Sequence, residues 1–315
     1  NGNLTAVGAF ALDANTTGSG NQAFGYGALG ANTTGGASTA VGYNALNSIT
    51  TNGGCTAVGY NALLLTTGEN NTGVGKDALT ANTTGAYNTA VGHSALDANT
   101  TANSNTAIGY AALGANTGAN NTAVGVSALL SNTTADSNTA VGSNALLSNT
   151  TGTNNTAVGH DCLEQNTGGN NTGVGFEALK ATTSGGDNTS LGAHSLSTNT
   201  TGQYNTAVGQ AALNLNTTGD SNTALGQGSL RANTTADANT AVGKDALTAN
   251  TTGQQNDAFG YTTMDAQTTG SYNAAFGALS ATSLDGGNRN TFCGNSSGSG
   301  LTTGSDNTFI GFKAG

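Results

Sequence analysis

Two glycine-rich strings in the sequence match motifs that carry out chemistry in other proteins. Residues 25–30 (GYGALG) spell G-x-G-x-x-G, which cradles a dinucleotide where a strand turns into a helix and an acidic residue follows about 20 positions later. Residues 294–298 (GNSSG) spell G-x-S-x-G, the sharp turn that presents the nucleophilic serine of many hydrolases. Both strings coincide with a repeat that fills the chain, and neither has the flanking strand and helix that the chemistry needs.

The residues that most often act as nucleophiles, bases or metal ligands lie far apart in the sequence. There is no histidine cluster, no paired cysteine spacing and no pair of carboxylates placed for catalysis, whereas catalytic, zinc and disulfide sites require such groups. The histidines and cysteines are His93, His160, His194, Cys55, Cys162 and Cys293. The sequence therefore predicts no catalytic residue, no metal site and no cofactor, and we expect that the protein is not an enzyme.

The composition argues against two classes of partner. Of the 315 residues, 50 are glycine and only 7% are charged, against about 25% in an average globular protein, and the formal net charge is −10. Nucleic-acid binding needs clustered basic side chains, whereas the six lysines and arginines here are scattered. The sequence also lacks an apolar run of about eighteen residues. We therefore expect neither nucleic-acid binding nor insertion into a membrane.

A seventeen-residue repeat organises the whole sequence. Its consensus, N-T-A-V-G-x-x-A-L-x-x-N-T-T-G-x-x, aligns on the first glycine, which recurs nineteen times. Fifteen of the eighteen intervals between these glycines have the full length of the consensus. The other three, which begin at Gly59, Gly109 and Gly159, are one residue shorter, and the missing residue falls in the N-T-T-G segment. A tolerated deletion predicts a loop, and the regular recurrence predicts a solenoid of stacked coils.

The repeat predicts an all-β fold. Only four apolar positions recur in each coil, too few for an amphipathic helix, whereas a β-branched residue beside threonine and closed by glycine is typical of a short strand before a tight turn. We expect a β-solenoid (a β-roll or β-helix) of about 19 coils, regular over residues 1–264. Residues 265–315 depart from the consensus and predict a cap or an assembly junction. The aromatic candidates for this role are Phe276, Phe292, Phe309 and Phe312.

The strand segment raises the question of which side chains face the coil interior. Side chains alternate along a strand, so Thr and Val of N-T-A-V-G share one face and Ala takes the other. We expect Val to point into the coil. The opposite position is small in nearly every coil, which predicts close packing of that face against copies of the chain, with the Ala ladders in the seam of a homotrimer. The alternative is a thin single-chain solenoid that is too flat for larger side chains.

Two sets of polar or variable positions carry further expectations. Asparagines recur before the strand and in N-T-T-G, where stacked amides can hydrogen-bond from coil to coil. N-T-T is also a glycosylation sequon, and the sequence leaves this modification open.

The two residues after the repeat glycine vary freely and are either a recognition surface or an unselected solvated face. The recognition candidates are Tyr26, Tyr43, Tyr60, His93, Tyr110 and His160.

The repeat resembles a known type. Residues 138–152 (NTAVGSNALLSNTTG) look like the repeats of phage tail fibres and of bacterial surface proteins with tail-fibre domains, and more distantly like the head repeats of trimeric autotransporter adhesins. The resemblance implies the rigid shaft of a homotrimeric fibre, extracellular on a virion or a cell surface, that serves attachment. Its partners would be copies of itself and a host-surface glycan or protein receptor. No functional residue is carried over, because the similarity lies in scaffold positions.

Two other functions remain as alternatives to the fibre. The chain could be the subunit of an extracellular filament that polymerises head to tail. The strand threonines, which recur in almost every coil from Thr5 onward, could instead bind ice by ordering water along a regular ladder. We expect the fibre before ice binding, because the strand alternation places these threonines on the face shared with the inward-pointing Val.

Overall fold

The computed structural model describes residues 2–315, which form strands and turns and, within this range, no helix. Each repeat contributes one strand of three residues, and neighbouring strands pair in parallel. The chain divides into two compact units, Asn1–Asn155 and Thr156–Gly315, and each of them is a parallel β-solenoid. The predicted all-β solenoid of about 19 turns, with one repeat in each turn, is confirmed.

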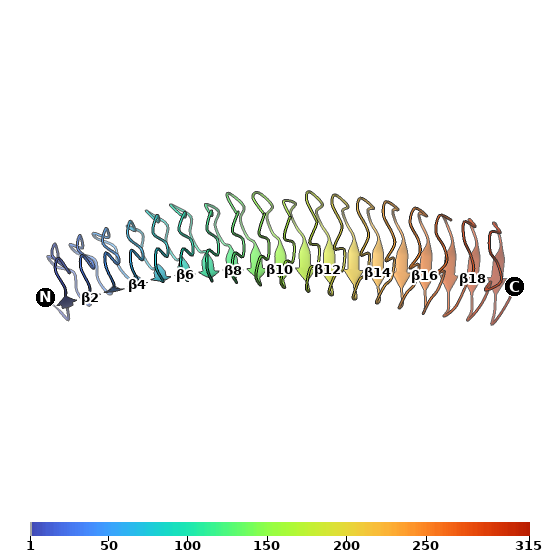
Figure 1. Ribbon diagram of the computed structural model, residues 1–315, viewed down its shortest axis with the longest axis horizontal. Helices are drawn as coiled ribbons and strands as arrows, with labels where there is room; N and C mark the ends of the chain where they lie inside the picture. Colours follow the sequence, from blue (N-terminus) through green and yellow to red (C-terminus); the bar gives the residue numbers. More distant parts are fainter. Residues whose placement is uncertain (1) are drawn as a thin grey trace. The chain divides into compact units, whose positions relative to one another are not determined.

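The described part of the first unit contains nine strands, which lie side by side along one flank of its coils (Figure 1). They are β1 (Thr5–Val7), β2 (Gln22–Phe24), β3 (Thr39–Val41), β4 (Thr56–Val58), β5 (Thr72–Val74), β6 (Thr89–Val91), β7 (Thr106–Ile108), β8 (Thr122–Val124) and β9 (Thr139–Val141). Equivalent residues of successive coils are partners, as Ala40 and Ala57 show. The register is unchanged across a shortened coil, where Thr106 pairs with Thr122. The missing residue therefore lies in a loop, as predicted.

The second unit continues the same pattern with ten strands among its residues. They are β10 (Thr156–Val158), β11 (Thr172–Val174), β12 (Thr189–Leu191), β13 (Thr206–Val208), β14 (Thr223–Leu225), β15 (Thr240–Val242), β16 (Asp257–Phe259), β17 (Ala274–Phe276), β18 (Thr291–Cys293) and β19 (Thr308–Ile310). The three strands within residues 265–315 keep the length and the parallel register of the others. The sequence changes there alter side chains and leave the strand framework intact.

The strand faces are the reverse of the expected orientation. Ala40, in the middle of β3, is fully buried, whereas Val41 at the third position is 38% exposed. The expectation that Val points into the coil is therefore wrong, and the Ala ladders do not line a seam between copies. The interior of each coil is filled mainly by two Ala and one Leu, here Ala40, Ala45 and Leu46, all 0% exposed. A thin core thus accounts for the small residue in the middle of the strand, as the alternative of a thin single-chain solenoid predicts.

The coils in which a larger residue replaces a buried Ala show how little space this core has. In β18 the middle residue is the buried Phe292, and the same coil has Gly298 where most coils have Leu. A Cβ on Gly298 would lie 2.2 Å from the Phe292 ring, so the ring occupies the volume of the missing Leu. Similarly, Cys162 replaces an Ala and is accommodated by Gly173, whose Cβ would lie 2.7 Å from the Cys162 Sγ. Because interiors are close-packed, each enlargement is matched by a deletion.

The backbone after each strand explains the strict glycine of the repeat. Gly109 has φ +137°, and a Cβ on it would lie 2.3 Å from the carbonyl oxygen of Gly125 in the next coil. Only glycine fits both this conformation and this approach. The following turn also places non-glycine residues in the left-handed region, such as Leu113 at φ +53°. A hydrogen bond from the Leu113 N–H to the carbonyl of Ala128 in the next coil (3.0 Å) helps to hold this conformation.

Two buried ladders of asparagine connect the coils. Asn88, just before β6, accepts a hydrogen bond from the backbone N–H of Asn105 (2.9 Å) and donates one to the carbonyl of Ala102 (2.9 Å). In the N-T-T-G ladder, Asn99 Nδ2 donates to Asn82 Oδ1 (2.9 Å). These asparagines are 0% exposed, and the predicted ladders are confirmed. A glycan on Asn82 or Asn99 would have to pull the amide out of the core, so the fold is incompatible with modification there.

Candidate assembly and recognition surfaces

The outward strand face is a regular surface that runs from coil to coil. The first and third side chains of each strand point away from the core, and we call this set the Thr–Val stripe, of which each unit has its own part. In the first unit the members are Thr5, Val7, Gln22, Phe24, Thr39, Val41, Thr56, Val58, Thr72, Val74, Thr89, Val91, Thr106, Ile108, Thr122, Val124, Thr139 and Val141. In the second unit they are Thr156, Val158, Thr172, Val174, Thr189, Leu191, Thr206, Val208, Thr223, Leu225, Thr240, Val242, Asp257, Phe259, Ala274, Phe276, Thr291, Cys293, Thr308 and Ile310.

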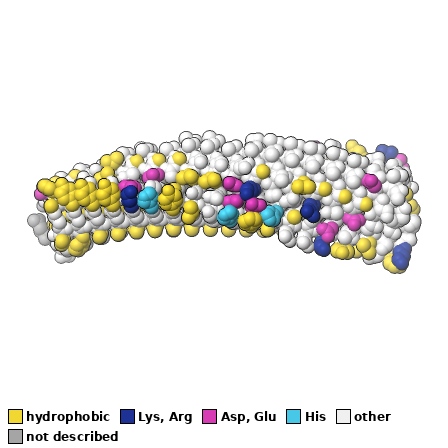
Figure 2. Space-filling model, in the orientation of Figure 1, with side chains coloured by type: hydrophobic (Ala, Val, Ile, Leu, Met, Phe, Trp, Pro, Cys, Tyr) yellow, Lys and Arg dark blue, Asp and Glu magenta, His cyan; other side chains and the backbone are white. Residues whose placement is uncertain are grey.

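The stripe is almost free of charge and rich in β-branched side chains. Asp257 is its only charged member among the described residues. Its aliphatic side chains are partly in water, since Ile108 is 41% exposed and Val141 is 36% exposed. Hydrophobic side chains form rows along the coils of the first unit (Figure 2). No charged side chain occupies the thirty outward strand positions from Thr5 to Val242, so the stripe is a candidate binding surface.

The stripe of the second unit also carries aromatic rings and a thiol. Phe259 and Phe276 stack with ring centroids 5.0 Å apart and planes 8° apart. Cys293 of β18 is exposed, whereas Cys55 and Cys162 are buried. Burial raises the pKa of the Cys55 thiol, and it raises the pKa of Cys162 to about 12. Cys293 is therefore the accessible thiol of the three, and it lies on the stripe.

The residues that follow the repeat glycine form a second outward row. Tyr26, Tyr43 and Tyr60 stack on one another with ring centroids 5.1 and 5.4 Å apart. His93 and Tyr110 stack with centroids 5.6 Å apart. All five side chains are exposed. Because stacked rings cover each other's faces, they offer ring edges and hydroxyl groups to a partner. The structure brings these candidates into one row, and their role in recognition stays a prediction.

The sixth recognition candidate, His160, stands at the edge of an ionic cluster that the sequence reasoning missed. Lys180 Nζ lies 2.8 Å from a Glu177 oxygen and 3.1 Å from an Asp161 oxygen. A third carboxylate, that of Glu164, lies 3.6 Å away. Hydrogen bonds to Glu177 and Asp161 raise the pKa of Lys180, and the bond from Lys180 lowers the pKa of Glu177. His160 Nδ1 lies 3.2 Å from Asp161. These charged residues stand one shortened repeat apart in the sequence, which places them at equivalent positions of two successive coils. This spacing is the sequence signal from which the cluster could have been predicted.

The four aromatic residues predicted to form a cap are not gathered in one place. Phe276 belongs to the Thr–Val stripe, where it stacks on Phe259. Phe292 lies in the core, with its ring centroid 5.8 Å from that of Phe309. Phe312 follows β19 and is 72% exposed. A role in capping or assembly stays a prediction for these residues.

The strings that resemble catalytic motifs are ordinary coil turns. Gly25 follows β2 directly with φ +136°, and the residues after it form turns in place of the helix that a dinucleotide site needs. Ser296 lies in the turn after β18, where its hydroxyl donates to Asn295 Oδ1 (2.9 Å). Within residues 2–315, no three His, Cys, Asp or Glu side chains are grouped so that they could hold a metal ion. In the same range, no helix is long and apolar enough to cross a membrane.

Comparisons with protein-family models and with curated proteins found no match to this sequence. The Thr–Val stripe and the row of residues after the repeat glycine are therefore the basis for inferring the function.

Proposed function

We propose that the protein is the shaft of an extracellular attachment fibre and that three chains pack through their Thr–Val stripes. The observation that supports this proposal is the outward strand face itself, which is almost free of charge and partly apolar. Covering it removes apolar area from water at a gain of about 25 cal/mol per Å². The number of chains, the extracellular location and the attachment role come from the resemblance to tail-fibre repeats.

The bonding between coils suits a stiff shaft. An inner coil of a unit pairs its strand with both neighbours, as β6 does with β5 and β7, and asparagine side chains add bonds in the same direction, such as that between Asn99 and Asn82. Bending a unit therefore strains many hydrogen bonds at once. Parallel strands are about 4.8 Å apart, so the nine coils of the first unit extend over about 40 Å. A stack that lengthens with each repeat acts as a spacer between a particle or cell and its target.

Sedimentation equilibrium of the purified protein tests the assembly. We expect a species of three times 30.4 kDa at micromolar concentration. Val141→Lys would place a charge in the seam and should shift the protein to the monomer. Thr134→Lys, at an exposed position of the N-T-T-G segment, should leave the trimer intact. A wild-type protein that sediments as a monomer would overturn the proposed seam.

Cross-linking through Cys293 provides an independent measurement. A trifunctional maleimide with short arms should link three chains, because Cys293 lies on the stripe and the other two thiols are buried. The matched control is Cys293→Ser combined with Thr303→Cys, which moves the thiol to an exposed position of the N-T-T-G segment. The control should run as a monomer on a denaturing gel. Equal cross-linking of both proteins would argue against the seam.

Electron micrographs separate the shaft from the filament. Discrete rods on a particle or cell surface support the shaft. Long uniform polymers formed by the purified chain would instead support a filament that assembles head to tail.

The corrected strand orientation also favours ice binding as a second candidate function. The stripe threonines face outward beside Val, so the objection that they share an inward face no longer applies. Their hydroxyl and methyl groups recur at the strand spacing of about 4.8 Å, a regularity that can order water. The two functions compete for one surface. A monomer whose thermal hysteresis is lost in Thr122→Lys would favour ice binding, and a trimer without hysteresis would favour the fibre.

A further inference from the structure

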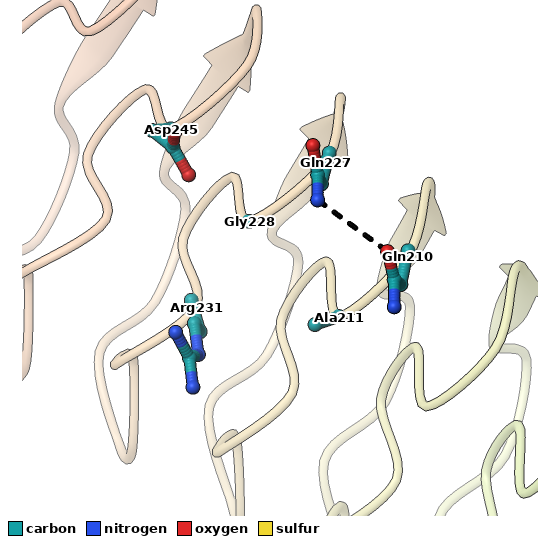
Figure 3. Close-up of a pocket in the computed structure, with 6 residues that line it drawn as sticks. All are labelled: Gln210, Ala211, Gln227, Gly228, Arg231 and Asp245. Atoms are coloured by element: carbon teal, nitrogen blue, oxygen red, sulfur yellow. Dashed lines mark hydrogen bonds between the residues drawn. The ribbon is translucent and has the colours of Figure 1, made fainter.

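A pocket in the second unit lies in the turns after three successive strands, β13, β14 and β15. Its volume is about 220 Å³. Its lining residues are Gln210, Ala211, Gln227, Gly228, Arg231 and Asp245 (Figure 3). None of these residues belongs to the Thr–Val stripe, so the pocket is a separate feature.

The floor of the pocket exists because two successive coils have almost no side chain at one position. Ala211 and Gly228 are the second residues after the repeat glycine, where most coils carry a polar side chain. No other two successive coils in the sequence have Ala or Gly at both equivalent positions. A Cβ on Gly228 would lie 2.4 Å from Asp245 Oδ1. The Asp245 carboxylate therefore reaches over the space that a side chain at position 228 would fill.

Polar groups of three kinds surround this floor. Gln227 Nε2 donates to Gln210 Oε1 at 3.4 Å, which joins the two amides into one wall with further donors and acceptors to offer. The Arg231 and Asp245 side chains lie on the side away from the two glutamines (Figure 3). Arg231 is exposed, and none of the ion pairs within residues 2–315 includes it.

The charge around the pocket is opposite in sign to that of the chain. Asp245 is paired with Lys244, whose Nζ lies 3.5 Å from Asp245 Oδ2. The remaining charge is that of Arg231, so the pocket is locally cationic in a chain of net charge −10. An anionic group on a ligand is therefore the natural partner of the Arg231 guanidinium.

We infer that this pocket binds an acidic sugar, a ring that carries one carboxylate beside hydroxyl groups. The planar guanidinium of Arg231 matches a carboxylate in a bidentate hydrogen-bonded pair. The glutamine amides donate to and accept from hydroxyls, and Asp245 accepts from them. The volume is below the roughly 300–1,000 Å³ of pockets for drug-sized ligands, which suits one ring of a surface polysaccharide. The inference rests on the proposed attachment function, for which it names the ligand class.

Titration of the full chain with single sugars tests the inference. The probes are glucuronate and galacturonate, with glucose, galactose, acetate and inorganic phosphate as comparisons, and binding is measured by NMR chemical-shift changes. We expect saturable binding of at least one uronate, and at least tenfold weaker binding of the other four probes. Arg231→Gln should weaken uronate binding at least tenfold. Lys76→Gln, which removes an exposed lysine in the first unit, should leave it unchanged.

A second variant tests the pocket shape without touching its charges. Ala211 has φ +55°, a left-handed conformation in which other coils carry Asn, as at Asn44 with φ +53°. Ala211→Asn should therefore fold normally while it fills the floor, and we expect at least a tenfold loss of uronate affinity. Ala111→Asn makes the same change at the equivalent position of the first unit and should leave binding unchanged.

Three results would overturn the inference. They are the absence of uronate binding, uronate binding that Arg231→Gln does not weaken, and equal affinities for uronate, acetate and phosphate, which would show binding of simple anions. Sedimentation and Cys293 cross-linking report on the stripe alone. A trimer that does not bind uronates would therefore refute the pocket inference and support the fibre. A monomer that binds uronates would refute the seam of the fibre and support the pocket inference.

Discussion

The asparagine ladder that precedes most strands should be a major source of stability, and Asn88→Ala tests this prediction. Asn88 is 0% exposed. Its Oδ1 accepts from the N–H of Asn105, and its Nδ2 donates to the carbonyl of Ala102, both at 2.9 Å. In the variant the Ala102 carbonyl keeps a second donor, Asn99 Nδ2 at 3.2 Å. The Asn105 N–H keeps no acceptor and stays buried, because the strand register holds its backbone in place.

The expected loss follows from these contacts. A buried N–H without an acceptor costs about 1–3 kcal/mol, and the lost bond to a carbonyl that remains partnered costs about 1 kcal/mol. The space left by the amide group adds about 1 kcal/mol. We therefore expect Asn88→Ala to lower the free energy of unfolding by about 3–5 kcal/mol. Thr84→Ala is the matched control, since Thr84 is exposed in the turn segment that precedes Asn88, and it should cost less than about 0.5 kcal/mol.

Urea denaturation followed by circular dichroism measures the loss of stability, and native-state hydrogen exchange locates it. The Asn105 amide should exchange faster in the variant than in the wild type, whereas the Thr84→Ala protein should match the wild type. Asn88→Asp separates the two roles of the side chain, because Asp can accept from Asn105 and cannot donate to Ala102. A loss below about 1 kcal/mol for Asn88→Ala, or unchanged exchange at Asn105, would refute the reasoning.

Three further sets of substitutions test the repeat glycine, the core and the ionic cluster by chemical denaturation. Gly109→Ala should cost about 3 kcal/mol or more, because its Cβ would lie 2.3 Å from a carbonyl oxygen at φ +137°. Ala123→Phe and Leu129→Gly, which copy the pairing in β18, should each destabilise strongly, and the double variant should cost less than their sum by about 1–3 kcal/mol. Lys180→Met should cost about 1 kcal/mol at pH 7, because three carboxylates lose their cation. Lys180 lowers the pKa of Glu177 in the folded protein below its usual value of 4.5. The stabilisation is therefore present above pH 4.5 and is lost as the pH falls through the pKa that Glu177 has in the folded protein. The difference in unfolding free energy between Lys180→Met and the wild type should shrink below pH 4.5.

The coil and its strand could be predicted from the sequence, because glycine and asparagine recur at positions that only a stacked turn explains. The direction of the strand side chains could not. Alternation shows that Thr39 and Val41 share a face, and hydrophobicity alone assigns that face to the core. The volume of the coil decides otherwise. Leu46 and two Ala already fill the interior, and the Leu reaches it from a left-handed backbone that its residue type does not predict.

The surfaces differ in how far the sequence reveals them. The stack of Tyr26 on Tyr43 follows once equivalent residues of successive coils are known to be neighbours. The Lys180 cluster follows from the same rule, applied to charges at equivalent positions of two successive coils. The pocket at Arg231 is harder to find, because it is made by what two coils lack at Ala211 and Gly228. A search of the sequence for reactive side chains does not detect a pocket that is created by missing side chains.

The reversed strand orientation gives the proposed packing between chains a firmer physical basis than the Ala ladders did. Small residues at Ala40 and its equivalents have a sufficient cause inside one chain, since Leu46 leaves them no room. The near absence of charge from the Thr–Val stripe is not explained by the core volume, because a lysine or glutamate at Thr39 or Val41 would point away from the core. We therefore take the composition of the stripe as support for the proposed packing between chains, and the composition of the core as a consequence of its small volume. For this reason Val141→Lys, and not an enlargement of the inward Ala, is the change that distinguishes an assembled fibre from an isolated solenoid.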